Sequence, residues 1–370
     1  MGFRALGVLL ATTLTMPAYA GAGRAVTPDA PDAAPTLGSL AAARGFVVGA
    51  GASDARELDD PAYAKLAATQ YNAIEPENSM KMNALEPSQG VFNFSRADEV
   101  VRFAAAHGLK VTATAPVWDG SGSDYEGSNP AWLSKGNFTA EELKSILQGY
   151  ITALMQHYHR DYPGVVNRWA VVSEATHVCD ALCKGLGKDA SGFPAYIALA
   201  YEDARAADPG VQLCYDDYGG EGLGKTSDTI YRLAKYLRSK GLIDCIGLEG
   251  QWEGVGVRGI PPAADLMRNI DRLGALGLSV YFSQVEIGLP VAQGVASEAE
   301  LNAQAKAYSK LLSTCLSTAA CKGFFTWGIS DKYAFCYKAG MCAPLPFDAN
   351  YRAKPAYRAL KRGLGGENPR

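Results

Sequence analysis

Short apolar segments alternate with longer amphipathic segments along most of the chain, and this repeat limits the possible folds more than any other feature. The short segments are typical of buried strands, and the longer ones have the spacing of helices that bury one face. The predicted strands are Phe46–Ala50, Ala73–Ile74, Lys110–Ala115, Arg168–Ser173, Gln212–Tyr215, Cys245–Leu248, Ser279–Ser283 and Gly323–Thr326. The predicted helices are Ala62–Gln70, Ala97–His107, Ala140–Tyr158, Pro194–Ala207, Ser227–Lys240, Pro262–Ala275, Ser297–Thr318 and Ala356–Arg362. This alternation predicts an α/β fold, a single-domain (β/α)8 TIM barrel.

Composition and charge exclude several other classes of protein. The 370 residues are 48% apolar and 20% charged, which is ordinary for a globular chain. The formal charge is −3 and no run of Lys and Arg occurs, so we expect no nucleic-acid partner. The glycines after the first predicted strand, Gly49 and Gly51, lack the third glycine of a dinucleotide-binding fingerprint.

The N-terminus has the pattern of a secretory signal peptide. Arg4 supplies a positive charge, an apolar run follows from Ala5 to Met16, and Ala18-Tyr19-Ala20 is a cleavage pattern. We therefore predict a signal peptide over 1–20, a flexible leader over 21–38 and the barrel domain over 39–365. The mature protein is expected to be secreted, extracellular, monomeric and without a membrane partner.

The eight cysteines all follow residue 178, and an even number in an exported protein favours disulfides. Short spacings suggest three local pairs: Cys179 with Cys183, Cys315 with Cys321, and Cys336 with Cys342. Cys214 and Cys245 remain, either bonded to each other or as free buried cysteines. Zinc is disfavoured because no CxxC pair occurs and the chain has only four histidines, so we predict no metal and no cofactor.

Carboxylates follow three of the predicted strands at the end where barrel enzymes hold their functional side chains. Glu174 follows the fourth strand, Glu249 the sixth, and Glu286 the seventh. Trp118 and Trp327 follow the third and eighth strands. Pairs of carboxyl groups beside aromatic side chains suit the cleavage of glycosidic bonds, so we expect a carbohydrate or glycoside substrate.

Several segments resemble glycoside hydrolase family 10, the family of endo-β-1,4-xylanases, from about residue 40 to 362. The matching segments are Tyr71–Lys81, Glu86–Phe94, Trp169–Glu174, Asp217-Tyr218, Thr326–Tyr333 and Pro346–Tyr357. The resemblance implies a polysaccharide cleft with Glu174 as the proton donor. The expected substrate-binding residues are Glu77, Asn78, Lys81, Trp118, Ser173, Tyr218, Gln251 and Trp327.

The active-centre motifs of the family are changed in this chain. Ser173 stands where the family has Asn before the acid, and Gln284 stands at the position of the nucleophile. The Gln-x-His motif after the sixth strand reads Glu249-Gly250-Gln251. An amide is a very poor nucleophile, so the covalent route is closed at Gln284. Gln251 can instead hydrogen-bond to this neutral side chain.

Two carboxylates are candidates for the second catalytic group. Glu286 shares strand parity with Gln284, so the two side chains face the same way and Glu286 is a candidate nucleophile or base. Glu249 is a candidate base for an inverting mechanism, which needs carboxyl groups about 6.5–9.5 Å apart. The sequence leaves two other functions open: an inactive carbohydrate-binding protein or decoy, and a barrel re-used for a different acid–base reaction.

Overall fold

The computed structural model describes residues 34–52, 55–121, 127–252, 255–292, 294–336 and 338–366. The predicted signal peptide and residues 21–33 of the predicted leader lie outside these ranges. From Pro35 onward the chain forms one compact unit. Helix α1, Leu37–Ala42, begins within the predicted leader because the Thr36 side chain accepts the Ser39 backbone N–H and caps it.

Eight parallel strands of the described chain close into a barrel, as the alternating pattern predicted. They are β1 Val47–Gly51, β2 Ala73–Glu75, β3 Lys110–Val117, β4 Val166–Ser173, β5 Gln212–Asp217, β6 Cys245–Leu248, β7 Ser279–Val285 and β9 Cys321–Thr326. Each pairs with its neighbours in this order, and β9 pairs with β1 to complete the ring. The carboxyl ends of all eight strands therefore meet at one mouth.

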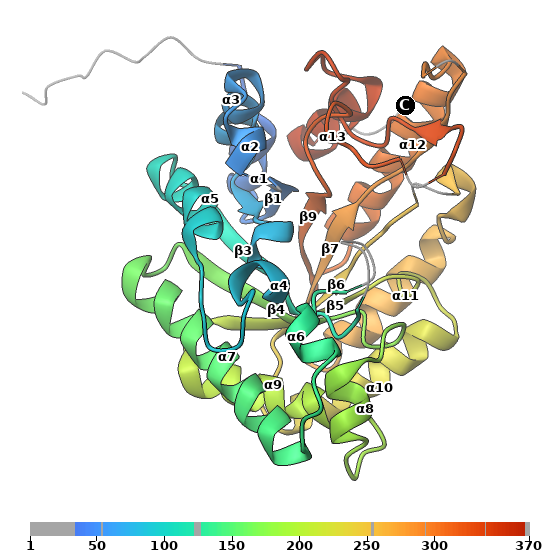
Figure 1. Cartoon of the computed structure of the whole chain (residues 1–370). Coiled ribbons are helices and arrows are strands. Elements are labelled where there is room, and N and C mark those ends of the chain that lie inside the picture. Colours follow the sequence, from blue (N-terminus) through green and yellow to red (C-terminus); the bar gives the residue numbers. More distant parts are fainter. Residues whose placement is uncertain are drawn as a thin grey trace, which may run out of the picture. The chain divides into compact units, whose positions relative to one another are not determined.

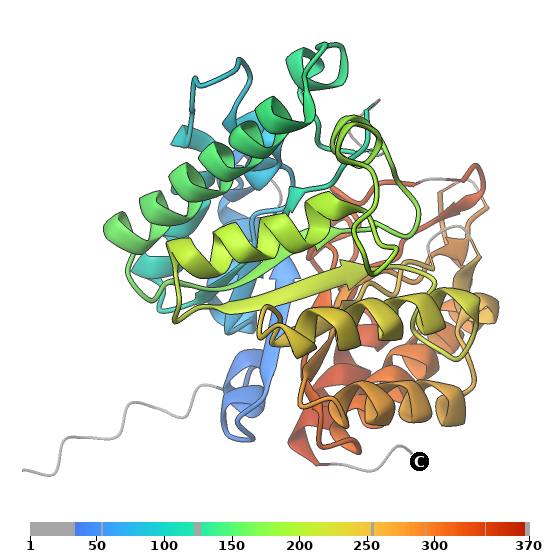
Figure 2. The ribbon, with the colours of Figure 1, turned by 90° about the horizontal axis from the view of Figure 1, so that it is seen from below.

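Helices surround the strands, as Figures 1 and 2 show. The longer ones are α3 Pro61–Gln70, α5 Ser95–Ala106, α7 Ala140–Asp161, α9 Ala195–Ala207, α10 Lys225–Ser239, α11 Ala263–Gly274, α12 Glu298–Leu316 and α13 Pro355–Gly365. The short ones are α2 Ala55–Leu58, η1 Asn78–Met80, α4 Met82–Leu85, α6 Ala131–Ser134, α8 Ala181–Leu186 and η2 Gly256–Gly259. Capping boxes at Thr139 and Ser297 fix the starts of α7 and α12. The sequence pattern missed a two-stranded pair, β8 Leu289–Pro290 with β10 Met341–Cys342.

The core has two parts, which is the usual result of closing a barrel. The larger part includes apolar residues of the strands and of the surrounding helices. The smaller part is a separate cluster of strand residues: Ala73, Cys214, Cys245, Tyr281 and Phe325. Gly49 makes room for it, because a Cβ on Gly49 would lie 2.1 Å from the Phe325 ring. Side chains thus fill the barrel below its mouth.

The four disulfides join the cysteines in the pairs that the spacing suggested. Three are local, and the fourth joins Cys214 to Cys245 on the adjacent strands β5 and β6. The alternative of free cysteines at 214 and 245 is therefore wrong. These two residues are register partners, so the bond crosses directly between strands.

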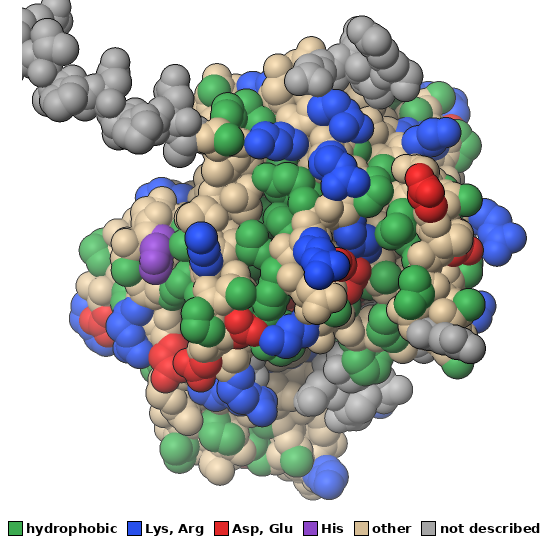
Figure 3. All heavy atoms as spheres, turned by 90° about the horizontal axis from the view of Figure 1, so that it is seen from above, with side chains coloured by type: hydrophobic (Ala, Val, Ile, Leu, Met, Phe, Trp, Pro, Cys, Tyr) green, Lys and Arg blue, Asp and Glu red, His purple; other side chains and the backbone are tan. Residues whose placement is uncertain are grey.

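Two further observations concern the surface. Among the described residues, no helix is both long enough and apolar enough to cross a membrane. On the face shown in Figure 3, apolar side chains lie between charged side chains of both signs, which is ordinary for a globular surface.

Removing the Cys214–Cys245 bond with the pair Cys214→Ala/Cys245→Ala is expected to lower the free energy of unfolding by about 3–4 kcal/mol, by the chain-entropy estimate for the loop it closes. The separation is 31 residues, against 4 for Cys179–Cys183. Urea unfolding of this variant and of Cys179→Ala/Cys183→Ala measures the loss of stability for each bond. Equal losses in the two variants would contradict loop closure as the source of the stabilisation.

Candidate active site

A cavity of about 480 Å³ opens at the mouth of the barrel. All twelve side chains predicted for the site line it: Glu77, Asn78, Lys81, Trp118, Ser173, Glu174, Tyr218, Glu249, Gln251, Gln284, Glu286 and Trp327. They come from the ends of β2 to β7 and β9. The closed barrel thus gathers into one cavity residues that are up to 250 positions apart, from 77 to 327.

The backbone is in the left-handed region at two of these positions. Glu174 has φ 54° and Gln284 has φ 57°. Next to Gln284, the pairing of β7 with β9 shifts register between Phe282 and Val285. Such conformations cost about 1–3 kcal/mol each in a residue other than glycine and are found mainly at functional sites. Gln284, which the sequence predicts to stand at the nucleophile position, therefore has an unusual backbone conformation.

Gln284 is held by a second amide, as the paired replacements predicted. Nε2 of Gln251 donates to Oε1 of Gln284 at 2.9 Å. This bond leaves the NH₂ group of Gln284 as the donor that a ligand or water can use. Glu286 follows on the same strand, and its backbone pairs with the Gly250–Trp252 segment after β6.

Burial, together with the negative charge of Asp217, raises the pKa of Glu174 to about 7. A side-chain hydrogen bond with Glu249, the cation Lys81 and the indole of Trp118 act in the opposite direction. A carboxyl group that titrates near neutral pH suits general acid catalysis.

Glu249 is fully buried, and no N–H or hydroxyl group of the described residues donates to its carboxyl oxygens. Burial, and then the charge of Glu174, raises its pKa well above the usual value. The side chain of Glu249 also acts on the pKa of Glu174 at hydrogen-bonding range, and two carboxyl groups can share such a bond only when one of them carries a proton. The deeper burial of Glu249 favours its neutral form.

More carboxyl groups lie deeper in the barrel. Burial, followed by the charge of Asp216, raises the pKa of Glu75 to about 8, and burial raises that of Asp216 to about 6. Arg168 opposes both shifts, and its guanidinium lies 3.7 Å from the ring centre of Tyr281. Gly247 makes room for the Asp216 carboxylate, since a Cβ there would lie 2.2 Å from it. The acids in the barrel thus outnumber the cation that faces them.

Asp217 organises the wall between strands β4 and β5. It accepts the Thr176 hydroxyl at 2.8 Å, the Tyr215 hydroxyl at 2.5 Å and the Tyr218 backbone N–H at 3.0 Å. His177 lies 3.4 Å from the same carboxylate and stacks on Tyr218 with ring centres 3.8 Å apart. Asp217 thus supports this wall of the cavity.

Some of the tryptophan side chains at the strand ends line the cavity, and one is part of the hydrophobic core. Trp118 and Trp327 line the cavity, and the Lys81 ammonium lies 4.5 Å from the ring centre of Trp118. Trp252, which follows β6, is 4% exposed and belongs to the core. The Ser173 hydroxyl lines the cavity and has no partner among the described residues, so it is free to bond to a ligand.

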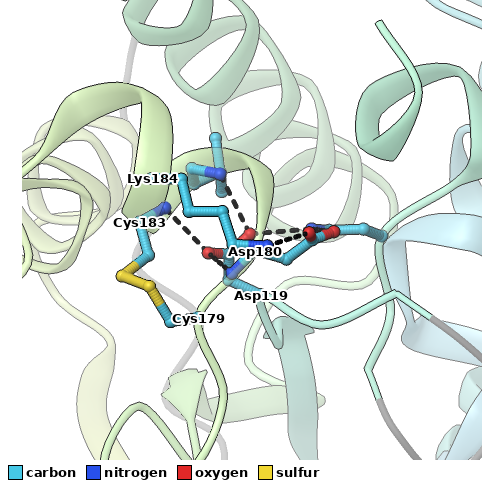
Figure 4. The surroundings of a disulfide bond; sticks show 7 residues. Asp119, Cys179, Asp180, Cys183 and Lys184 are labelled. Carbon is cyan, nitrogen blue, oxygen red and sulfur yellow. Dashed lines mark hydrogen bonds and ion pairs between the residues drawn. A yellow bond between two sulfur atoms is a disulfide. The ribbon is translucent and has the colours of Figure 1, made fainter.

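Asp119 anchors the loop that follows β4 (Figure 4). Its carboxylate accepts the backbone N–H groups of Asp180, Leu182 and Cys183 at 2.8–3.0 Å, beside the Cys179–Cys183 disulfide. The chain that carries Glu174 is therefore fixed by a buried charge and a covalent bond.

Sequence reasoning missed several residues at the site. Glu57, Tyr63, Tyr333 and Phe335 also line the cavity, and Glu75 lies below it. Tyr333 is the last residue of a segment that resembles the family, and Glu75 directly follows a predicted strand, so the sequence held a signal for each. Glu57 lies in the short helix α2, which had no predicted counterpart.

Comparisons with known proteins agree with this geometry. The model of glycosyl hydrolase family 10 matches residues 36–362. The chain therefore belongs to glycosyl hydrolase family 10. This membership and the relatives below support a glycosidase-type enzyme.

Among its relatives, an endo-1,4-beta-xylanase A of Phanerodontia chrysosporium is 31% identical over 339 residues, covering 89% of this chain and 77% of the relative. An endo-1,4-beta-xylanase B of Thermotoga neapolitana is 30% identical, with coverage of 82% and 83%. The crystal structure of xylanase 10B from Thermotoga petrophila in complex with xylobiose has a TM-score of 0.81 at 29% identity, covering 90% of this chain and 98% of that one.

The buried carboxyl groups predict that the protein loses stability as pH rises. Glu75 titrates near 4.5 when exposed and near 8 when folded, so between these values the folded state binds more protons than the unfolded state. The free energy of unfolding should fall with rising pH, by up to about 1.4 kcal/mol per pH unit for each such group. Urea unfolding at several pH values should show a smaller slope for Glu75→Gln than for the parent. The exposed control Glu141→Gln should keep the parent slope, and an unchanged slope in Glu75→Gln would refute the assignment.

Proposed function

We propose that the protein is a secreted glycosidase that cleaves β-linked glycans or glycosides, with a xylan backbone as the first substrate to test. The observation that carries the proposal is the partly buried Glu174, with a pKa of about 7, in a cavity with aromatic walls. The family and the names of its relatives support the reaction class. The xylobiose complex of a structural neighbour supports the choice of backbone.

In the proposed reaction, Glu174 gives its proton to the glycosidic oxygen as the bond to the anomeric carbon breaks. A water molecule forms the new bond to that carbon, and Glu286 takes the proton that the water loses. The products are two free hydroxyl groups, with inversion at the anomeric carbon. Ser173, Tyr218 and Trp327 are proposed to bind the sugars.

Two arguments favour Glu286 over Glu249 as the second carboxyl group. Burial and the charge of Glu174 raise the pKa of Glu249 well above its usual value, which favours the protonated form, and a protonated carboxyl group is no base. The side chain of Glu249 also acts on the pKa of Glu174 at hydrogen-bonding range, which places it beside the acid rather than across a sugar ring from it. We therefore assign Glu249 to holding a proton next to the acid.

The amide pair suits this mechanism. Oε1 of Gln284 is engaged by Gln251, so its NH₂ group is available to hold the attacking water in place of a covalent nucleophile. A neutral Gln284 also adds no negative charge that would repel Glu286 in the ionised form.

Secretion is part of the proposal because the N-terminal pattern and the disulfides support it. Disulfides persist mainly in oxidising compartments, and all eight cysteines of this chain are bonded.

Glu174→Gln should lower kcat/KM on unactivated xylo-oligosaccharides by about 10²–10⁴, the usual contribution of a positioned acid. The same substitution should lower kcat/KM far less on dinitrophenyl xylobioside, because dinitrophenolate leaves without being protonated. Glu286→Gln should slow both substrates, since each needs the attacking water. The matched control is Glu202→Gln on α9, which should behave as the parent. Equal loss on both substrates in Glu174→Gln would contradict its role as the acid.

Stereochemistry supplies a further prediction. The anomer formed first, followed by proton NMR, should be inverted for the parent enzyme. Gln284→Glu places a carboxylate at the position of the family's nucleophile, where Gln251 can still donate to it, and should shift the product toward retention. Retention by the parent would contradict Glu286 as a base and favour it as a nucleophile.

The second candidate function is a carbohydrate-binding protein without turnover, which the amide at Gln284 favours. Its signature is tight binding of xylo-oligosaccharides with no hydrolysis by the parent and hydrolysis gained in Gln284→Glu. A barrel re-used for another acid–base reaction would show neither binding nor turnover of these sugars.

A further inference from the structure

A second, larger hollow lies beside the candidate active site. It is an open groove of about 1050 Å³ between α10 on one side and, on the other, the segment after β4 and the loop between α8 and α9. Its first residue, Ala175, directly follows Glu174 in the chain.

One pair of stacked rings separates the groove from the active-site cavity. His177 lines the groove, Tyr218 lines the cavity, and their ring centres are 3.8 Å apart. Asp217 holds both sides of this wall through Thr176 and the Tyr218 backbone. A chain of sugars that leaves the cavity over these rings therefore enters the groove.

The charges in the groove are one-sided. Lys188, Lys225, Arg232 and Lys235 line it, all four are exposed, and none makes an ion pair with a carboxylate of the described chain. The carboxylate of Asp189 in the loop wall accepts the Tyr236 hydroxyl at 2.6 Å and the Ser191 backbone N–H, and its single charge offsets at most one of the four cations. In a protein with a net charge of −3, four neighbouring unpaired cations are attractive to an anionic ligand.

Aromatic and hydroxyl groups accompany the cations. Phe193 and Tyr236 are stacked, with ring centres 6.1 Å apart, and both line the groove. Ser191, Thr226 and Thr229 add hydroxyl groups. Aromatic faces and hydroxyl groups suit sugar rings, whereas the cations suit carboxylate substituents on them.

We infer that this groove, next to the His177–Tyr218 pair, binds the acidic part of a β-linked glycan, a chain with uronic acid substituents whose neighbouring sugars occupy the active-site cavity. The inference rests on the proposed function of that cavity, and it narrows the substrate from neutral to carboxylate-bearing glycans. The groove contributes affinity and selectivity and takes no part in bond cleavage.

The test measures binding separately from turnover. Isothermal titration of the full-length Glu174→Gln variant compares xylo-oligosaccharides that carry glucuronic acid with unsubstituted ones of the same backbone length. The acidic oligosaccharides should bind about three- to tenfold more tightly at low salt, and the advantage should shrink at physiological ionic strength because exposed charges are screened.

A matched pair of variants locates the effect. Adding Arg232→Gln/Lys235→Gln should remove most of the advantage of the acidic oligosaccharides and leave the affinity for neutral ones unchanged. Lys65→Gln/Lys144→Gln removes the same charge from α3 and α7 and should keep the advantage. All of these side chains are exposed, so circular dichroism is expected to show the parent fold for each variant.

Equal affinity for acidic and neutral oligosaccharides, or equal losses in the two double variants, would overturn the inference. Competition by polyglutamate as effective as that by the acidic glycan would replace it with a general anion site. Failure of the proposed function looks different, since the parent enzyme would then leave unsubstituted xylan intact whatever the groove binds.

Discussion

The burial of several carboxyl groups at the mouth of a closed parallel barrel is the constraint on which the rest of the site depends. Eight strand ends converge there, and four of them bring Glu75, Glu174, Asp216 and Glu249 into surroundings that raise their pKa values. The cations Arg168 and Lys81 offset only part of this. Bound protons therefore share with these cations in neutralising the cluster, and the number of protons that the site holds changes around neutral pH.

In the predicted alignment with the family's motifs, the carboxyl and amide groups of the site exchange positions. Glu249 is predicted to stand where the family has Gln, and Gln284 where it has the nucleophile. In the proposed function the site keeps its proton donor and obtains its base from Glu286, which lies just beyond the end of β7.

Much of the fold and of the site could be predicted from the sequence because both follow from short-range patterns. Strand and helix periodicity fixed the barrel, and strand ends fixed which side chains share the cavity. Spacing indicated three of the cysteine pairs, whereas the sequence left open whether Cys214 and Cys245 were bonded. The raised pKa of Glu249 could not be predicted, because it depends on burial and on the charge of Glu174, which lies on another strand end. The same holds for the basic groove, whose cations come from α10 and from a loop about 40 residues earlier.

The left-handed backbone at Glu174 and Gln284 affects how mutants of this site should be interpreted. Valine, isoleucine and threonine fit such a conformation poorly, whereas glycine, asparagine and aspartate adopt it readily. A saturation library at either position therefore samples chain geometry as well as chemistry. An inactive valine variant would say little about proton transfer, and the informative replacements are those with unbranched side chains.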